Sequence, residues 1–331
     1  MSTSAPPPGS RIAAGGRGGR ARPAETLLAA RIARRYYIEG ASKSDIATEF
    51  GLSRFKVARM LDKARSTGLV RIELHYDGEI DLALSVELAS HLDLPRCLVI
   101  DSPEGDESLL RTNLGRVAAG LLEEITDESD VLGLAWSRTT MAMRSALTAL
   151  APCAVVQLTG ALSRPDVDES SIELVRDVAR ITRGPAFYFY APMIVPEPET
   201  ARSLRMQPEV AQAMERYARL TKAVVTTGAW MPAQSTVVDA LTRSAYEQGR
   251  EAGVVAEVCG IQLDADGHPM STTLSERIIG IGADQLRSVP EIITIAYGEA
   301  KVTAVQAVVR GGFVTSLVTH ASLARALLAS T

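Results

Sequence analysis

The 331-residue sequence has few aromatic residues and few cysteines, and each shortage argues against a class of protein. Aromatic residues make up only 5% of the chain, which disfavours an aromatic platform for stacking single-stranded nucleic acid. Cys97, Cys153 and Cys259 are odd in number and widely spaced, with no CxxC or Cys/His pair. We therefore expect three buried free thiols, no disulfide framework and no metal site.

Long apolar runs are also missing. No stretch approaches the ~18 to 20 apolar residues that span a bilayer. The N-terminal segment has no apolar core of the kind that marks a secretory signal. Hydrophobic residues at 46% and charged residues at 22% are ordinary for a globular chain. We expect a cytoplasmic protein that does not bind membranes, with about two domains at ~150 residues each.

Charge is distributed unevenly along the chain. Residues 1–75 contain 14 Lys and Arg against 6 Asp and Glu, whereas the remainder contains 21 against 33. A small basic end on an acidic body suggests that one part of the chain contacts a polyanion. Residues 1–22, rich in Pro, Gly, Ala, Ser and Arg, predict a disordered basic tail, which either contacts DNA phosphates or is simply solvated.

Residues 23–76 have the pattern of a winged helix-turn-helix. Apolar residues at helical spacing predict a first helix from about residue 25 and two further helices. Ser42 and Ser53 are the expected N-caps of the second and third helices, and Gly51 supplies the turn between them. The alternating segment 69–76 predicts the strand of the wing.

The third helix presents a basic face away from its apolar stripe. In a helix-turn-helix, the N-terminal part of this helix enters the major groove, although such a face could also be merely solvated. We favour binding to double-stranded operator DNA. The residues we expect at the DNA are Ser42, Lys43, Ser53, Arg54, Phe55, Lys56, Arg59 and Lys63.

Residues 77–331 have the pattern of a Rossmann-like α/β effector and oligomerisation domain. Leu84, Leu88 and Leu92 recur every four residues and predict an amphipathic helix that could pack on a partner chain. Apolar strand-like runs then alternate with helical stretches, which favours a parallel sheet covered by helices on both faces. The predicted strands are 97–100, 131–136, 154–158, 186–190, 223–227, 292–297 and 313–318.

Ligands of open α/β sheets bind where the strands end and helices begin. The clearest such turn is Ser137, Arg138, Thr139 and Thr140, between an apolar strand and a helix. Its hydroxyls, main-chain N–H groups and guanidinium could bind a phosphate, or the segment could be a plain N-cap.

Three further turns follow apolar strands. We expect effector contacts from Gly160 and Arg164, from Gly228, and from Lys301 in the first turn of a helix. The helix dipole slightly opposes a lysine at that position, so a bound anion would explain Lys301, although it could equally be an ordinary surface lysine.

The segment GVVAEVCGIQLDADG places Glu257 among apolar residues and Asp264 beside a turn. We expect both carboxylates at the effector, with Asp264 accepting hydrogen bonds from sugar hydroxyls. DADG is also ordinary turn chemistry, and it lacks the ligand array of a calcium loop.

These segments together carry a resemblance to a known family. ARRYYIEGASKSDIATEFGLSRFKVARMLDKARSTGLVRIEL resembles the DNA-binding head of the SorC/DeoR-type sugar-responsive bacterial transcription regulators. VLGLAWSRTT, AVVQLTGAL, GVVAEVCGIQLDADG and IAYGEAKVTAVQAVVRGGFVTSLVTHASLARALL resemble later blocks of that family in the same order. The resemblance covers about residues 25–330.

The resemblance implies an effector domain related to sugar-phosphate isomerases, a phosphorylated sugar, polyol or similar metabolite as signal, and a dimer or tetramer. By position, 137–140 would hold the phosphate, and Asp264 and Lys301 would face the sugar. This sequence departs from the family at three places. Ser137 replaces a glycine, Arg138 stands where some members have a Schiff-base lysine, and 319–321 reads Thr-His-Ala instead of Thr-Asp-Glu.

Two classes of function follow. The first is a DNA-binding regulator with a metabolite sensor, without catalytic residues or a cofactor. The second is an active sugar-phosphate isomerase or deaminase, whose general base could be Glu257, Asp264 or His320. We favour the regulator, because no carboxylate/His pair occurs at close spacing in a predicted site turn. An RNA-binding protein is disfavoured by the helix-turn-helix pattern and the scarce aromatics.

Overall fold

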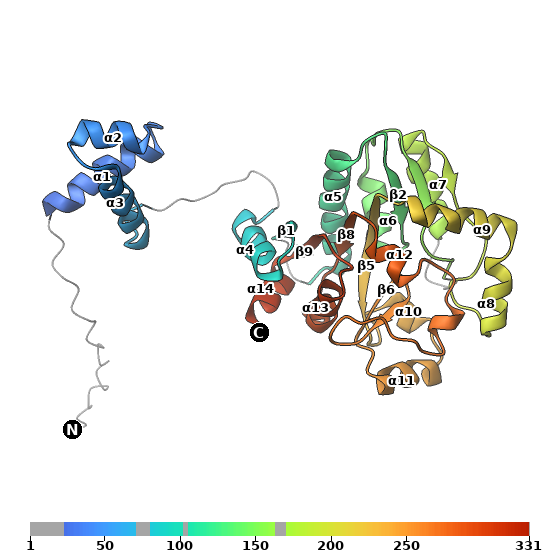
Figure 1. Ribbon diagram of the computed structural model, residues 1–331. Coiled ribbons are helices and arrows are strands. Elements are labelled where there is room, and N and C mark those ends of the chain that lie inside the picture. Colours follow the sequence, from blue (N-terminus) through green and yellow to red (C-terminus); the bar gives the residue numbers. More distant parts are fainter. Residues whose placement is uncertain (1–22, 71–79, 102–104, 163–169, 331) are drawn as a thin grey trace, which may run out of the picture. The chain divides into compact units, whose positions relative to one another are not determined.

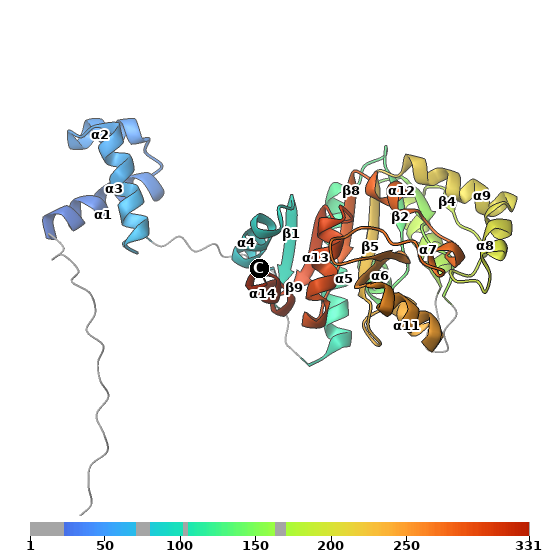
Figure 2. The same ribbon diagram turned by 60° about the horizontal axis from the view of Figure 1, so that its bottom comes forward.

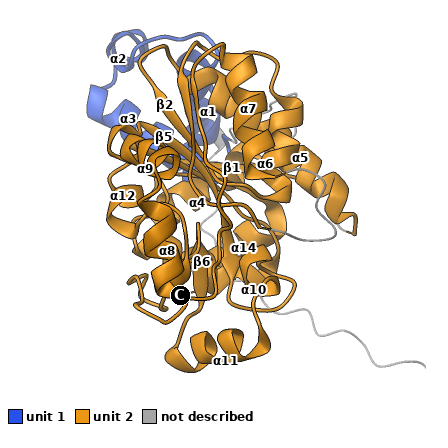
Figure 3. Cartoon of the chain, turned by 90° about the vertical axis from the view of Figure 1, so that its right-hand side faces the viewer, with its two compact units in different colours: residues 1–74 blue, residues 75–331 orange. Residues whose placement is uncertain are grey.

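The computed structural model describes residues 23–70, 80–101, 105–162 and 170–330. The chain divides into two compact units, residues 1–74 and 75–331, which Figure 3 colours separately. The expected basic tail, most of the expected wing strand at 69–76, and Arg164 lie outside the described residues.

The described part of the first unit consists of three helices, as the sequence predicted (Figure 1): Pro23–Tyr37 (α1), Lys43–Phe50 (α2) and Arg54–Ser66 (α3). Ser42 and Ser53 are the predicted N-caps, and their side chains accept the main-chain N–H groups of Asp45 and Lys56. Gly51 ends α2 at φ 62°, a left-handed conformation that glycine adopts without a Cβ clash.

The core of this unit draws on all three helices. Ile32 of α1, Ile46 of α2 and Val57 and Leu61 of α3 are almost completely buried and belong to one hydrophobic cluster. Because these contacts use one side of α3, its opposite side is left exposed to solvent.

The second unit is built on a parallel sheet, which confirms the predicted α/β class. Its strands lie in the order β1-β9-β8-β5-β2-β3-β4, and every neighbouring pair in this order is parallel. Each of the seven predicted apolar runs overlaps one of these strands. They are Arg96–Ile100 (β1), Val131–Leu134 (β2), Ala154–Gln157 (β3), Ala186–Phe187 (β4), Lys222–Ala229 (β5), Glu291–Ile295 (β8) and Ser316–His320 (β9).

Helices cover both faces of this sheet, which is why its strands are apolar on both sides. Along β5, Val224 packs in the cluster that includes α5 (Glu107–Ile125), whereas Val225 packs in the cluster that includes α13 (Val302–Arg310). Figures 1 and 2 show α4 (Leu82–Leu92) and α14 (Ala321–Ala329) beside the β1 edge.

The other helices are α6 (Arg138–Ala146), α7 (Ser171–Thr182), α8 (Pro198–Arg205), α9 (Pro208–Met214), α10 (Thr236–Asp239), α11 (Arg243–Ala252) and α12 (Ala283–Arg287). Short 3₁₀ turns occupy Glu215–Arg219 (η1), Ser275–Arg277 (η2) and Glu299–Lys301 (η3).

The leucine stripe of α4 requires a correction. Leu84 and Leu88 belong to the core cluster of their own unit, and the helix packs on β1 and α14. Leu88 is fully buried there. The stripe therefore closes the β1 end of this unit and is not a surface for a partner chain.

A hairpin that the periodicity did not predict lies in the segment GVVAEVCGIQLDADG. Ala256–Val258 (β6) and Ile261–Leu263 (β7) pair antiparallel, and β6 also pairs antiparallel with the end of β5. Cys259 and Gly260, both at positive φ, form the tight turn. Because such short strands leave little alternation to read, only the tertiary pairing reveals them.

The three cysteines are buried and free, as predicted. Burial raises the pKa of each thiol, and that of Cys97 reaches about 12. The thiols are therefore protonated and unreactive at neutral pH.

The chain direction across the sheet reverses between β2 and β5. From β2 the chain continues to β3 and β4 toward one edge, and it then returns to β5 on the other side of β2. From β5 it continues to β8 and β9 toward the opposite edge. In open parallel sheets such a switch point leaves a crevice at the carboxyl ends of the strands, where ligands bind.

Candidate functional site

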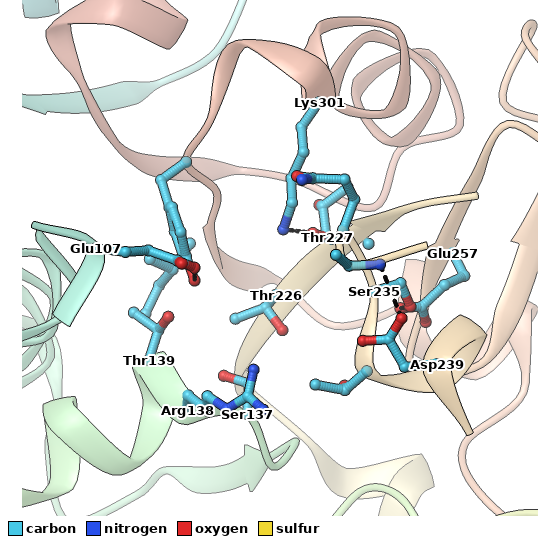
Figure 4. A pocket seen from close by; sticks show the side chains of 16 residues that line it. Glu107, Ser137, Arg138, Thr139, Thr226, Thr227, Ser235, Asp239, Glu257 and Lys301 are labelled. Atoms are coloured by element: carbon cyan, nitrogen blue, oxygen red, sulfur yellow. Dashed lines mark hydrogen bonds between the residues drawn. The ribbon is translucent and has the colours of Figure 1, made fainter. Parts of the chain in front are cut away.

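A polar cleft lies at this switch point. It encloses about 600 Å³ of empty space, open mouth included, where β2, β5 and β8 end. Figure 4 shows Ser137, Arg138 and Thr139 on one side, Lys301 on the other and Thr226 between them. The lining residues are Glu107, Ser137, Arg138, Thr139, Thr226, Thr227, Gly228, Ala233, Gln234, Ser235, Thr236, Asp239, Glu257, Ile295, Tyr297 and Lys301.

The turn after β2 contributes the start of α6, as the sequence predicted. The Ser137 side chain accepts the N–H of Thr140 at 3.0 Å, and the Thr140 side chain accepts the N–H of Ser137 at 2.7 Å. This reciprocal capping box fixes the first turn of α6 against the cleft. The plain N-cap reading is therefore correct for Ser137 and Thr140, and it is compatible with a binding role for their neighbours.

Thr140 is not among the residues that line the cleft. Its side chain is completely buried, and its hydroxyl lies 2.9 Å from the carbonyl oxygen of Ala135, to which it donates. Its hydrogen-bonding capacity is thus used within the turn. The prediction that Thr140 contacts an effector is therefore corrected, whereas Thr139, predicted together with it, lines the cleft beside the exposed Arg138.

Lys301 lies on the opposite wall, at the end of the 3₁₀ turn η3 and directly before α13. Its ammonium group donates to the carbonyl of Thr227 at 2.9 Å and lies 5.1 Å from the centre of the Tyr297 ring. Burial lowers the pKa of Lys301, and the negative charge of Glu257 partly opposes this shift. The cation is held in place by the protein and does not extend into solvent as an ordinary surface lysine would.

Glu257 in β6 is a buried carboxylate on the same cleft. It accepts hydrogen bonds from the hydroxyl of Ser235 at 2.8 Å and from the N–H of Gly260 at 3.1 Å. Burial raises the pKa of Glu257, while these two bonds and the charge of Lys301 act in the opposite direction. A Cβ on Gly228 would lie 2.2 Å from Glu257 Oε1, so the glycine permits this close approach.

A second, smaller cavity, with about 400 Å³ of empty space including its open mouth, adjoins the cleft and shares Thr226, Thr236 and Glu257 with it. Gly160 lines this cavity together with Trp136. A Cβ at Gly160 would lie 2.6 Å from the carbonyl oxygen of Pro192. Gly160 is therefore required for close backbone packing at the cavity wall.

Asp264 lies away from both cavities, which corrects the prediction that it faces a sugar. Its side chain accepts the N–H groups of Asp266 and His268 at 3.0 and 2.8 Å and so closes a turn. The hydrogen bond from His268 contributes most to lowering the pKa of Asp264, and burial opposes this shift. Ordinary turn chemistry accounts for this residue.

Among the described residues, the side chains of this turn are also placed so that they could hold a metal ion: Asp264, Asp266 and His268. Their potential ligand atoms lie within 4.8 Å of one another on the surface, and the sequence analysis did not anticipate this proximity. Exposed acidic groups commonly lie this close without a metal, and here the hydrogen bonds of the turn already explain the arrangement.

Several cleft residues were not singled out from the sequence. Glu107 comes from the start of α5 and accepts a hydrogen bond from the Tyr297 hydroxyl at 3.0 Å. Ser235 and Asp239 come from α10, where the Ser235 side chain caps the helix. Ser235 had a sequence signal as a hydroxyl before TVVD, but nothing local indicated that this turn reaches the cleft.

In the first unit, the expected DNA-binding residues lie at the start of α2 and in α3 with its N-cap. Arg54, Phe55, Lys56, Arg59 and Lys63 are all exposed. Ser42 and Ser53 are occupied as N-caps. The Lys43 ammonium lies 5.5 Å from the centre of the Tyr36 ring, and Lys63 pairs with Glu25 of α1 at 3.2 Å.

Known proteins match this combination of units. The family model described as "Putative sugar-binding domain" matches residues 77–329, most of the chain. A transcriptional regulator of Escherichia coli, YjhU, is 31% identical over 305 residues, which cover 89% of this chain and 92% of that protein. The chain belongs to the SorC/DeoR-type family of sugar-binding transcriptional regulators. This confirms the resemblance noted in the sequence.

Further matches of this regulator extend over nearly its whole length. The transcriptional regulator LsrR of Klebsiella pneumoniae is 29% identical, covering 92% of this chain and 94% of LsrR. The full-length sorbitol operon regulator SorC of Klebsiella pneumoniae has a similar fold, with a TM-score of 0.71 at 22% identity. That structural match covers 91% of this chain and 98% of SorC.

The regulator was expected not to associate with membranes. Among the helices in the described ranges, none combines the length and the apolar character needed to cross a bilayer.

Proposed function

We propose that this regulator binds operator DNA through α3 of a winged helix-turn-helix, and that a phosphorylated sugar, polyol or related metabolite in the cleft controls that binding. The DNA-binding part is supported by the exposed cations Arg54, Lys56 and Arg59 in the N-terminal half of α3. In this motif the N-terminal end of the second motif helix reaches base edges, and nearby cations bind phosphates.

The effector part rests on one observation above all. The capped start of α6 meets the cleft beside Arg138 and Thr139, with the partly buried cation Lys301 on the opposite wall. A helix N-terminus carries a partial positive charge and favours an anion, and a guanidinium and a hydroxyl add hydrogen-bond donors. A phosphate group fits this combination better than a neutral sugar does.

The remaining lining indicates the rest of the effector. Glu107, Asp239 and Glu257 contribute carboxylates, and Thr226 and Ser235 contribute hydroxyls. Carboxylates accept hydrogen bonds from the hydroxyls of a sugar or polyol, and protein hydroxyls can both donate to them and accept from them. A ligand without hydroxyl groups would leave these protein groups unpaired. The name of SorC, a sorbitol operon regulator, agrees with a carbohydrate signal of this kind.

Calorimetry on the full chain tests the effector directly. Sorbitol 6-phosphate, ribose 5-phosphate and glycerol 3-phosphate are each compared with sorbitol, ribose and glycerol. We expect at least one phosphorylated compound to bind far more tightly than its unphosphorylated partner and to change the affinity for DNA in fluorescence anisotropy. If every pair binds equally, or only the unphosphorylated member binds, the phosphate assignment is wrong.

We further propose that the chain regulates and does not catalyse. Of the three bases considered for an isomerase, only Glu257 lines the cleft described above, and Ser235 and Gly260 already hydrogen-bond to it. Incubation of the binding compound with the full chain, followed by mass spectrometry and sugar analysis, should return it unchanged. Release of ammonia or an isomerised product would instead establish an enzyme.

We also propose a dimer or tetramer, because operators read by this motif present repeated half-sites about one helical turn, or a multiple of it, apart. The α4 leucine stripe no longer supports this assembly, since it is buried within one chain. Light scattering at micromolar concentration, with and without DNA, tests it. A monomer under both conditions would contradict the proposal.

A further inference from the structure

An exposed aromatic ring lies at the start of α3. Phe55 is 82% exposed, more than the other large apolar side chains identified as exposed in the described residues. It is the second residue of the helix, two positions after the N-cap Ser53. Leaving a phenylalanine in water forgoes the free energy that burial would provide, so this position is unfavourable unless a partner covers the ring.

The position of Phe55 on the helix excludes the core as that partner. Val57, which is fully buried, follows Phe55 by two residues, or about 200° around an α-helix. The ring therefore lies on the side of α3 away from the buried cluster. Arg59, one turn further along, shares this side, and Arg54 and Lys56 flank the ring in sequence.

The surrounding charge selects the class of partner. Arg54, Lys56 and Arg59 are exposed cations close to the ring. A surface that binds a neutral or basic protein has no need of such a concentration of positive charge. A polyanion fits this surface. Double-stranded DNA combines phosphates with a groove that presents one exposed apolar group, the C5 methyl of thymine.

We propose that Phe55 contacts the C5 methyl group of a thymine in the major groove and is a specificity-determining residue for an A·T pair in the operator. This inference rests on the proposed DNA binding through α3. The phenyl ring has no hydrogen-bonding group, so it does not read the donors and acceptors of a base edge. Its selectivity comes from the methyl group, which cytosine and uracil lack.

The experiment uses the full chain and an operator selected by it from random duplex DNA. Each thymine of that operator is replaced in turn by deoxyuridine, which removes only the methyl group. Fluorescence anisotropy should show that replacing a thymine contacted by Phe55 weakens wild-type binding about fourfold. This is the change in affinity expected when one buried methyl-sized group is lost. Phe55→Ala should bind the thymine operator more weakly and should be indifferent to deoxyuridine at that position.

Ile38→Ala is the matched control, because Ile38 is also highly exposed and lies outside α3. This variant should keep the full deoxyuridine effect. Thermal melts of all three proteins should coincide, since both side chains are exposed. If deoxyuridine weakens binding equally in wild type and Phe55→Ala, or does not weaken wild-type binding at any position, the proposed role of Phe55 is wrong. The proposed DNA binding would stand in either case. Failure to select any operator overturns this inference together with the proposed DNA binding.

Discussion

The ammonium group of Lys301 donates a hydrogen bond to the main-chain carbonyl of Thr227 at 2.9 Å. This bond connects the turn after β8 to β5, so the cation is positioned at the cleft before any ligand arrives. Preorganisation of this kind reduces the entropy lost when a ligand is bound. The pairing also explains how residues 74 positions apart come to share one site.

Replacing Lys301 by Met should remove this cation while keeping most of its apolar stem. We expect binding of the tightest phosphorylated compound to weaken by about 1.5 to 3 kcal/mol, since a hydrogen bond to a charged group is lost. Calorimetry provides the measurement. Arg250→Ala, which removes an exposed cation of α11, is the control and should bind normally. Equal binding by Lys301→Met and wild type would show that this lysine has only a structural role.

Adjacent threonines of α6 should respond differently to the same change. Thr140→Val removes a buried hydroxyl that bonds to Ala135 and Ser137, so it should lower the free energy of unfolding by about 1 to 3 kcal/mol. Thr139→Val should instead weaken binding of the phosphorylated compound, with a smaller effect on unfolding. Chemical denaturation and calorimetry on both variants test the distinction. The reverse pattern would contradict the assignment of the cleft wall.

Glu257 should make stability depend on pH. Its pKa is raised by burial, so the folded protein holds this proton more tightly than the unfolded chain does. The resulting stabilisation is complete below the unfolded pKa, at about 4.3, and is lost as the pH rises through the higher folded pKa. Glu257→Gln keeps a polar group beside Ser235 but cannot ionise. Relative to wild type, this variant should gain stability as the pH rises, measured by urea denaturation at several pH values. A constant difference between the two proteins would refute the raised pKa.

The exposed cations of α3 should dominate DNA affinity. A triple variant, Arg54→Ala with Lys56→Ala and Arg59→Ala, should lose nearly all specific binding to the selected operator, since one bidentate base contact alone is worth about 1 to 3 kcal/mol. Lys63→Ala should weaken specific and non-specific DNA about equally, and only modestly because Lys63 already pairs with Glu25. Anisotropy at matched salt concentrations is the measurement. Unchanged operator binding by the triple variant would exclude α3 as the reading helix.

Leu88 tests the corrected role of α4. Leu88→Ala should reduce the free energy of unfolding by about 2 to 5 kcal/mol, because the side chain is fully buried within its own unit. Under native conditions, the mass measured by light scattering should match that of wild type. A variant of normal stability that dissociates would restore the stripe as a subunit interface.

Local chemistry was enough to predict the helices of the first unit and the seven parallel strands of the second. The N-caps Ser42, Ser53 and Ser137, the left-handed Gly51 and the apolar strands could all be read from neighbouring residues, because capping and periodic burial act over a few positions. The turn at 137–140 was assigned to the effector site for the same reason, since it joins a strand to a helix, and all but Thr140 of it lines the cleft. The family resemblance extended this reading to the order of the body segments.

Contacts between distant segments decided the rest. The spacing of Leu84 and Leu88 fits a helix at a dimer interface as well as a helix in a core. Only the packing of α4 against β1 and α14 shows that it is a core helix. Asp264 and Glu257 belong to one short segment, yet the β6–β7 hairpin puts Glu257 on the cleft and leaves Asp264 in a surface turn. Glu107, Ser235 and Asp239 join the cleft because the strand order places the ends of β2, β5 and β8 side by side. Periodicity is a local property, whereas which faces meet depends on how the whole chain minimises its exposed apolar surface.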